Sequence, residues 1–256
     1  MAGGGSLRGE YRISLVIPCY NEAPRLDVDQ FRQFLAENNQ TRILFVDDGS
    51  TDDTVSVLER LRSGHEDCAE ILRNGKNEGK AEAVRFGMTH ALDTFQQEIV
   101  GYWDADLATP LASVARFLTL LDNRPEIEMV FGSRVKLLGR DVQRRPVRHY
   151  LGRVFATLVS QMLRLPIYDT QCGAKLFRVI PGIQQIFAER FLSKWVFDVE
   201  IIARYLKLYG GDPKQLERII YEYPLETWVD IPGSKVLPKD FFKAFQDLFK
   251  IKRKYL

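Results

Sequence analysis

Short runs of apolar residues recur along the first half of the chain, and each run is followed by polar residues. Four of them have the length and composition of β-strands: 12-RISLVIPCY-20, 41-TRILFVDD-48, 98-EIVGYWDAD-106 and 127-IEMVFGSR-134. Apolar residues recur at helical spacing in four further segments, residues 27–38, 52–63, 78–95 and 110–122. Strands that alternate with helices of this length indicate βαβ units. The pattern therefore predicts an α/β fold with a Rossmann-like, mostly parallel twisted sheet flanked by helices.

The four predicted strands all end in polar residues, namely 20-YNE-22, 47-DDGS-50, 104-DAD-106 and 132-GSR-134. In parallel α/β sheets, ligands bind beyond the carboxyl ends of the strands. We therefore expect these side chains to meet at one binding site. Asp47 and Asp48 are costly to bury unless they accept hydrogen bonds, for example from a base or a ribose.

Asp104 and Asp106 are separated by one residue, directly after the third predicted strand. In an extended segment this spacing sends both side chains to the same side, so both can reach one ion. The chain has neither GxxxxGK[ST] nor GxGxxG, so a bound diphosphate needs another partner. A divalent cation held by carboxylates meets that need. The competing interpretation is a turn with solvent-exposed acidic side chains, since the motif DxD by itself is compatible with this turn and with a metal site.

Composition and charge limit the possible classes of protein. The chain has 256 residues, of which 45% are hydrophobic and 27% charged, and its net charge is +2. This suits one compact domain and does not call for nucleic acid as a partner. We expect a flexible tail over residues 1–11, the main domain over 12–240 and a basic amphipathic tail helix over 241–256.

The cysteines and the apolar segments point to a location at the cytoplasmic face of a membrane. Cys19, Cys68 and Cys172 lie far apart, which argues for a reducing compartment and against disulfide or zinc frameworks. We interpret Cys172 as a small buried side chain. The first ten residues lack the apolar core of a signal peptide, and no run approaches the roughly 18 apolar residues of a spanning helix. We therefore expect peripheral attachment.

A basic segment runs from Arg134 to Arg153. It contains seven basic residues against one acid, Asp141, and the basic residues are Arg134, Lys136, Arg140, Arg144, Arg145, Arg148 and Arg153. A solvated surface loop is one interpretation. The other is an anionic partner such as a lipid phosphate, because arginine forks match phosphate oxygens.

The last residues, 239-KDFFKAFQDLFKIKRKYL-256, are typical of an amphipathic helix. We expect one face to carry Phe241, Phe242, Phe245, Leu248 and Phe249. Such a face packs on a protein core or lies on a bilayer, and the basic residues at 252–254 favour the bilayer. Residues 151–168 form another amphipathic stretch with the same two interpretations.

Six motifs along residues 12 to 240 together resemble glycosyltransferase family 2, whose members have the GT-A fold. They are 18-PCYNE-22, 47-DDGSTDDT-54, 77-NEGKAEAVRFG-87, 104-DAD-106, 133-SR-134 and 169-DTQCGAKLF-177. Within the family, the chain is most similar to the polyprenyl-phosphate sugar synthases, and especially to the dolichyl-phosphate β-glucosyltransferases.

The resemblance implies a role for each matching residue. Asp104 and Asp106 would hold Mg²⁺ or Mn²⁺, and they form the implied catalytic set with Arg134 and Lys175, which would face phosphate groups. Arg134 and Arg148 would lie at the acceptor phosphate. The implied nucleotide-sugar site comprises Pro18, Tyr20, Glu22, Val46, Asp47, Asp48, Asn77, Lys80, Asp104, Ala105, Asp106 and, from a closing loop, Lys235.

The implied activity is the inverting, metal-dependent transfer of a hexose from a nucleoside-diphosphate sugar to a polyprenyl or dolichyl phosphate at a membrane surface. Ala108 stands where mannose synthases carry a glutamine, and 169-DTQCG-173 is closer to the glucosyltransferases. Both features favour UDP-glucose over GDP-mannose. A phosphate acceptor is already an anion and needs no strong base, whereas an alcohol would need one. Three alternatives remain: a synthase that uses GDP-mannose, a soluble family 2 transferase with a hydroxyl acceptor, and a binding module without catalysis.

Overall fold

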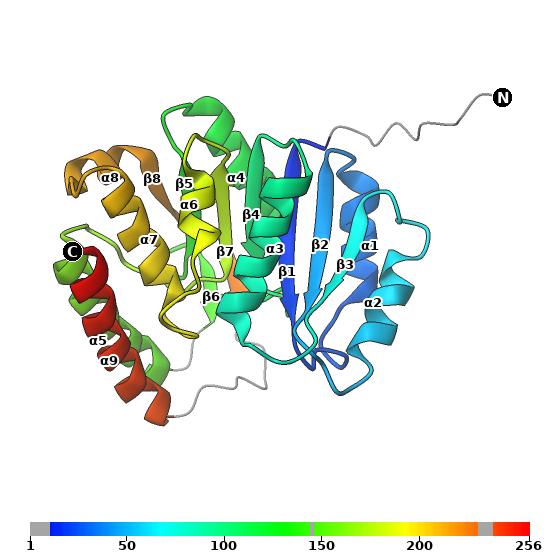
Figure 1. Ribbon diagram of the computed structural model, residues 1–256, viewed down its shortest axis with the longest axis horizontal. Helices are drawn as coiled ribbons and strands as arrows, with labels where there is room; N and C mark the ends of the chain where they lie inside the picture. Colours follow the sequence, from blue (N-terminus) through cyan, green and yellow to red (C-terminus); the bar gives the residue numbers. More distant parts are fainter. Residues whose placement is uncertain (1–10, 144–145, 230–237) are drawn as a thin grey trace.

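A seven-stranded sheet forms the centre of the molecule (Figure 1). The computed structural model describes residues 11–143, 146–229 and 238–256, and describes the backbone alone at 143, 146–151 and 238–242. The strand order is β3-β2-β1-β4-β7-β5-β8. These strands are β1 (Ile13–Cys19), β2 (Thr41–Asp47), β3 (Ala69–Arg73), β4 (Ile99–Trp103), β5 (Met129–Ser133), β7 (Ala174–Arg178) and β8 (Ile220–Pro224). Two short strands, β6 (Asp141–Gln143) and β9 (Thr227–Val229), pair with each other.

The sheet is mostly parallel, as the sequence predicts, with one exception. Strands β1, β2, β3 and β4 run parallel, and so do β5 and β8. Strand β7 runs antiparallel between β4 and β5. Its insertion places the segment that precedes β7 at the carboxyl ends of its two neighbours. The strands predicted at residues 12–20, 41–48, 98–106 and 127–134 are confirmed as β1, β2, β4 and β5.

Helices cover both faces of the sheet (Figure 1). Leu15 and Ile17 of β1 belong to the core that includes α1, α2 and α4, whereas Val16 belongs to the core of α3, α6 and α7. This alternation follows from the two-residue period of a strand. The helices are α1 (Val28–Glu37), α2 (Thr54–Arg62), α3 (Lys80–Thr94), α4 (Ala112–Asn123), α5 (Pro146–Leu163), α6 (Ile183–Ala188), α7 (Phe197–Leu208), α8 (Pro213–Ile219) and α9 (Pro238–Tyr255).

Helix α9 packs through one face against the core formed by α3, α6 and α7. Ala244, Leu248 and Ile251 are buried, and α9 contacts α7. Phe245 contacts Phe155 of α5, with ring centroids 6.4 Å apart. Phe249 points away from this face and is 76% exposed. The expected apolar face is therefore wrong at Phe249, because helical geometry aligns residues 244, 248 and 251 and rotates Phe249 outward.

Two other points concern the expected amphipathic segments. The side chains of Phe241 and Phe242 lie outside the described residues. The stretch 151–168 is helical as far as Leu163, where α5 ends. Across the ranges that the structure describes, every helix is too short or too polar to cross a bilayer.

Candidate active site

A cavity of ≈ 660 Å³ lies beyond the carboxyl ends of β1, β2, β4 and β5. Its lining combines the segments that follow these strands with the segment before β7, the start of α7 and residues of α5 and α9. Segments that are far apart in the sequence thus meet at one edge of the sheet, as the polar strand ends predict.

Asp104 and Asp106 lie on a tight turn directly after β4. Leu107 has a φ of 53°, and the Ala108 N–H donates to Asp106 Oδ1 at 3.1 Å. The Asp104 N–H donates to the carbonyl of Gly173 at 2.9 Å. A Cβ at Gly173 would overlap the Asp104 carboxylate, so only glycine leaves room for it. The segment before β7 therefore fixes the position of Asp104.

The two carboxylates concentrate negative charge at the cavity. Burial raises the pKa of Asp106, and the charge of Asp104 raises it further. The Lys80 ammonium forms an ion pair with Asp104. Burial by itself lowers the pKa of Lys80, but the carboxylates of Asp104, Asp198 and Asp106 together outweigh burial, and the pKa is raised. The Lys80 ammonium thus neutralises part of the negative charge of the two carboxylates. The charge that remains favours a further positively charged group at this site.

The carboxylates fit a divalent cation whose coordination a ligand completes. Over the described ranges, there is no group of three or more His, Cys, Asp or Glu side chains that could enclose a metal. Asp104 and Asp106 could supply oxygen ligands from one side. Phosphate oxygens and water would supply the rest, as is common for Mg²⁺.

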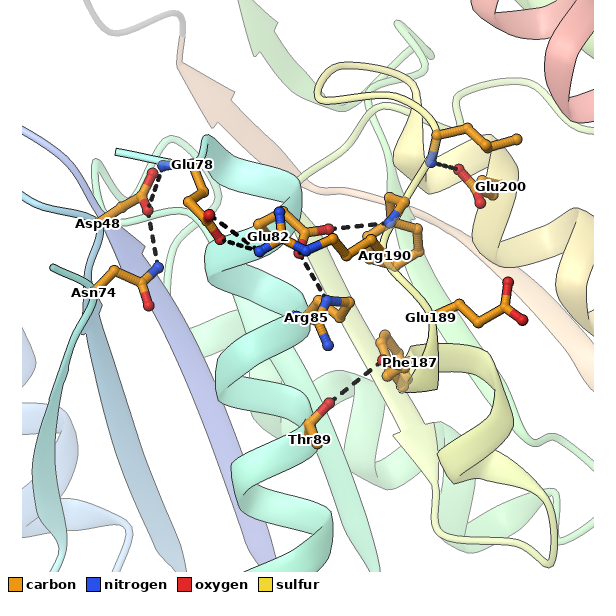
Figure 2. Close-up of polar contacts among 12 residues, drawn as sticks. Asp48, Asn74, Glu78, Glu82, Arg85, Thr89, Phe187, Glu189, Arg190 and Glu200 are labelled. Carbon is orange, nitrogen blue, oxygen red and sulfur yellow. Dashed lines mark hydrogen bonds and ion pairs between the residues drawn. The ribbon is translucent and has the colours of Figure 1, made fainter. Parts of the chain in front are cut away.

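Asp48 organises the loop between β3 and α3 (Figure 2). Its carboxylate accepts hydrogen bonds from Asn74 Nδ2 at 2.9 Å, from the Glu78 N–H at 3.0 Å and from the Gly79 N–H at 2.7 Å. Both acids are buried; Asp48 also lines the cavity, and Asp47 accepts from the Ser50 N–H at 3.1 Å. The cost of burying these two adjacent carboxylates is therefore offset by hydrogen bonds from backbone N–H groups and from the Asn74 amide.

The end of β1 and the segment after it also line the cavity, through Pro18, Tyr20 and Glu22. Glu22 pairs with Arg25 at 2.5 Å. Asn21 has a φ of 50°, and its side chain accepts from the Thr51 N–H at 2.8 Å. This contact joins the segment after β1 to the segment after β2.

Arg134 forms a bidentate ion pair with Asp169. Arg134 Nε lies 2.6 Å from Oδ2 and Nη2 lies 2.7 Å from Oδ1. The guanidinium also lies 5.3 Å from the ring centroid of Trp228. The Asp169 N–H donates a hydrogen bond to Glu222 Oε1 at 2.7 Å. Burial raises the pKa of the Glu222 carboxyl. Arg134 thus enters the cavity as part of a rigid pair.

Lys175 lies beneath the cavity and is fully buried. Its ammonium pairs with Asp198 at 2.6 Å and donates to the carbonyls of Thr170 at 3.0 Å and Cys172 at 2.5 Å. The Tyr102 hydroxyl also donates to Asp198. Lys175 therefore supports the segment that reaches Gly173. Burial raises the pKa of the Cys172 thiol to about 11, which keeps it protonated near neutral pH.

The structure brings most of the expected site residues to the cavity. Those that line it are Pro18, Tyr20, Glu22, Asp48, Asn77, Lys80, Asp104, Ala105, Asp106 and Arg134. Val46 is buried in the core, and Asp47 and Lys175 lie below the lining. Lys235 and the side chain of Arg148 lie outside the described residues.

Several lining residues were not singled out from the sequence, among them Arg25, Tyr168 and Lys194. Trp195 would be expected in the core from its sequence context, but it lines the cavity and is partly exposed. Asp169 and Gln171 also line the cavity, and their signal was present in the motif 169-DTQCG-173. Lys194 had no comparable signal, because its approach to the cavity depends on how the segment before α7 folds back over α3.

The fold and the site together define the class of protein as a GT-A glycosyltransferase. Residues 14–181 match the family model described as glycosyl transferase family 2. The chain is 32% identical over 271 residues to the dolichyl-phosphate beta-glucosyltransferase of Saccharomyces cerevisiae, with 96% of this chain and 76% of that protein covered. The human protein of the same name is 31% identical over 261 residues, with 96% and 76% covered. The chain therefore belongs to glycosyltransferase family 2 and is a glycosyltransferase.

Solved structures share the fold at lower identity. One is the glucosyl-3-phosphoglycerate synthase of Mycobacterium tuberculosis with Mn²⁺, UDP-glucose and phosphoglyceric acid, which has a TM-score of 0.64 and 15% identity and covers 96% of this chain and 80% of that one. A mannosyltransferase of Pyrobaculum calidifontis with GDP-Man and Mn²⁺ has a TM-score of 0.58 and 20% identity, with 94% and 62% covered. These likenesses confirm the GT-A fold.

Proposed function

We propose that this glycosyltransferase transfers a glucosyl group from UDP-glucose to the phosphate of a polyprenol such as dolichol, with Mg²⁺ or Mn²⁺ and with inversion at the anomeric carbon. The observation that carries the proposal is the pair Asp104 and Asp106 at the cavity, within a chain similar to dolichyl-phosphate beta-glucosyltransferases. Ala108 after the pair agrees with glucose as the sugar.

Asp104 and Asp106 are the residues that would hold the cation, which would neutralise charge on the departing diphosphate. The raised pKa of Asp106 and the ion pair between Lys80 and Asp104 both express the excess of negative charge that such a cation relieves. Gly173 keeps Asp104 in place through its carbonyl and through the absence of a side chain.

The acceptor phosphate provides the nucleophile. One of its oxygens forms a bond to the anomeric carbon while the bond from that carbon to the UDP oxygen breaks, and the electron pair leaves with UDP. No proton has to be removed, so no general base is required. Histidine is absent from the described lining, and Asp198 is held by Lys175 and Tyr102.

Basic residues near α5 would bind the acceptor phosphate. Arg134 lines the cavity, and Arg153 lies 4.0 Å from the ring centroid of Tyr168, which also lines it. Arg148 belongs to the same helix as Arg153 and remains a proposed acceptor contact. Lys235 likewise remains a proposed contact to the donor.

Part of the cavity lining is apolar and suits an isoprenoid chain. Phe155 and Ala156 of α5, Ala244 of α9 and Trp195 contribute to it. On the outer surface, Val154 and Phe249 are exposed on the same two helices. Exposed apolar residues beside a basic helix end suit an interfacial position. We infer that the protein meets the cytoplasmic face of a membrane here.

The acceptor can be tested with a matched pair of lipids. The purified protein is incubated with radiolabelled UDP-glucose, Mn²⁺ and either dolichyl phosphate or dolichol in detergent, and lipid-extractable label is counted. We expect label only with dolichyl phosphate. Equal labelling of dolichol, or labelling of neither lipid while soluble sugars are labelled, would overturn the proposed acceptor.

A further inference from the structure

Lys194 lies in the segment between α6 and α7 and reaches back over the start of α3. Its side chain lines the cavity. A Cβ at Gly79 would lie 3.1 Å from Lys194 Cδ, so the aliphatic part of Lys194 lies against Gly79. Gly79 has a φ of 97° and immediately precedes Lys80. Lys194 therefore enters the cavity on the side of Lys80 and its partner Asp104.

The other cations at the cavity already have partners. Lys80 pairs with Asp104, Arg25 with Glu22, and Arg134 with Asp169, while Arg153 lies over Tyr168. Lys194 is exposed, by contrast, and neither an ion pair nor a hydrogen bond of its ammonium is found within the part of the chain that the structure describes. An ammonium that lines a cavity without a partner is suited to an anionic ligand.

We propose that Lys194 binds the diphosphate of the nucleotide-sugar donor, an assignment that rests on the proposed function. The diphosphate carries about two negative charges in the donor and about three once the bond to the sugar breaks. The charges of Asp104 and Asp106 take up much of the positive charge of a bound cation and of Lys80. Lys194 supplies the additional positive charge on the same side.

Arg190 positions the segment that carries Lys194 (Figure 2). Its guanidinium donates to Glu78 Oε2 at 2.9 Å, and its Nε lies 3.7 Å from Glu82 Oε2. Glu82 also accepts from the Phe191 N–H at 3.0 Å. Residues 190 and 191 are thereby tied to Glu82 in the first turn of α3 and to Glu78, two residues before the helix.

These contacts connect Arg190 to Asp48, which lines the cavity on the proposed donor side. Asp48 accepts from the Glu78 N–H, and Glu78 pairs with Arg190 (Figure 2). The Leu192 N–H also donates to the buried Glu200 at 2.7 Å. Residues 190–192 are thus held by α3 and α7, and they position the segment that leads to Lys194. Arg190 acts on the donor through Lys194.

Binding of UDP and of uridine, each with Mn²⁺, separates a diphosphate contact from other effects. Calorimetry is performed on the wild type, Lys194→Met, Lys194→Arg and the surface control Lys214→Met. We expect Lys194→Met to weaken UDP binding about tenfold and to leave uridine binding unchanged, because uridine has no phosphate. Lys194→Arg should restore most of the affinity, and Lys214→Met should match the wild type.

A double-mutant cycle tests the role of Arg190. We expect Arg190→Gln to weaken UDP binding by about twofold to threefold, because exposed ion pairs are worth little. In the Lys194→Met background it should have no further effect. An undiminished effect of Arg190→Gln in that background would overturn the positioning role.

The outcomes distinguish this proposal from the proposed function. Equal UDP affinity of the wild type and Lys194→Met would overturn the assignment of Lys194 alone. A loss confined to the KM for polyprenyl phosphate would overturn its assignment to the donor. A wild type that neither binds UDP nor transfers glucose, but uses another nucleotide sugar, would overturn the proposed donor. In that case, a loss of affinity in Lys194→Met for the corresponding nucleoside diphosphate, but not for the nucleoside, would still support the role of Lys194.

Discussion

The main chain of Gly173 lies directly against the carboxylate of Asp104. The Asp104 N–H donates to the Gly173 carbonyl at 2.9 Å, and any side chain at residue 173 would overlap the carboxylate. The antiparallel strand β7 begins one residue later and brings this contact to the end of β4. The geometry of the proposed cation site therefore depends on a residue that has no functional group of its own.

Substitution of Gly173 should impair activity through Asp104. We expect Gly173→Ala to displace the carboxylate and to lower kcat/KM for glucosyl transfer about 100-fold, since a displacement of about 1 Å can have that effect. Gly75→Ala is a matched control, because a Cβ there meets no atom within 4 Å. Initial rates with a circular dichroism spectrum of each variant check the prediction. Wild-type rates in Gly173→Ala would contradict the role of the contact.

The sequence predicted the part of the site that follows from strand ends. Asp104 and Asp106 follow an apolar run, and such a run places its last residues at one edge of a parallel sheet. The partner of each charged residue could not be predicted in this way. Arg134 and Asp169 are 35 residues apart, and their pairing depends on the insertion of β7.

Some strands also escaped prediction for physical reasons. Strand β3 reads Ala69–Arg73 with charged residues at two of its five positions, and its side chains are largely half-buried. At the C-terminus, the hydrophobic stripe of α9 was recognised, but its exact face depended on α7, which the sequence does not reveal. Phe249 consequently points outward and Ile251 inward.

Lys175 and Asp198 should contribute to stability as a pair. We expect Lys175→Met to lower the free energy of unfolding by about 3–5 kcal/mol, because it leaves Asp198 buried without its counter-charge. The double variant Lys175→Met with Asp198→Asn should recover part of that loss. Urea denaturation measures all three proteins. A single variant as stable as the wild type would contradict the buried ion pair.

The pH dependence of stability should reveal the raised pKa of Asp106. Because the pKa is higher in the folded than in the unfolded chain, the ionised carboxylate costs stability above the folded pKa. The cost disappears as the pH falls below the ordinary value of about 3.9. In EDTA, we therefore expect Asp106→Asn to raise the Tm relative to the wild type near pH 7, by an amount that shrinks toward pH 4.

The same variant should lose its response to the cation. With Mn²⁺ at pH 7, we expect the Tm of the wild type to rise and that of Asp106→Asn to stay nearly constant, while transfer falls at least 100-fold. Thermal scans with and without Mn²⁺ are the measurement. An equal Mn²⁺ response in both proteins would place the cation elsewhere.

Two residues of α9 separate packing on the protein from contact with a membrane. Tyr255 donates to Glu200 at 2.8 Å and accepts from Arg204 at 3.2 Å, so Tyr255→Phe should cost about 1 kcal/mol of unfolding free energy. Phe249 is exposed, and Phe249→Ser should change stability by less than about 0.5 kcal/mol. It should nevertheless reduce flotation with liposomes that contain anionic lipid. Unchanged flotation would argue against α9 as the membrane contact.

The identity of the donor and its dependence on a cation form the central claim. The most direct measurement offers the purified protein dolichyl phosphate with radiolabelled UDP-glucose, GDP-mannose or UDP-GlcNAc, each with Mn²⁺ and with EDTA, and counts the label in the lipid phase. We expect lipid-phase label only from UDP-glucose, and only when Mn²⁺ is present. Preferential transfer from GDP-mannose or UDP-GlcNAc, or undiminished transfer from UDP-glucose in EDTA, would contradict it.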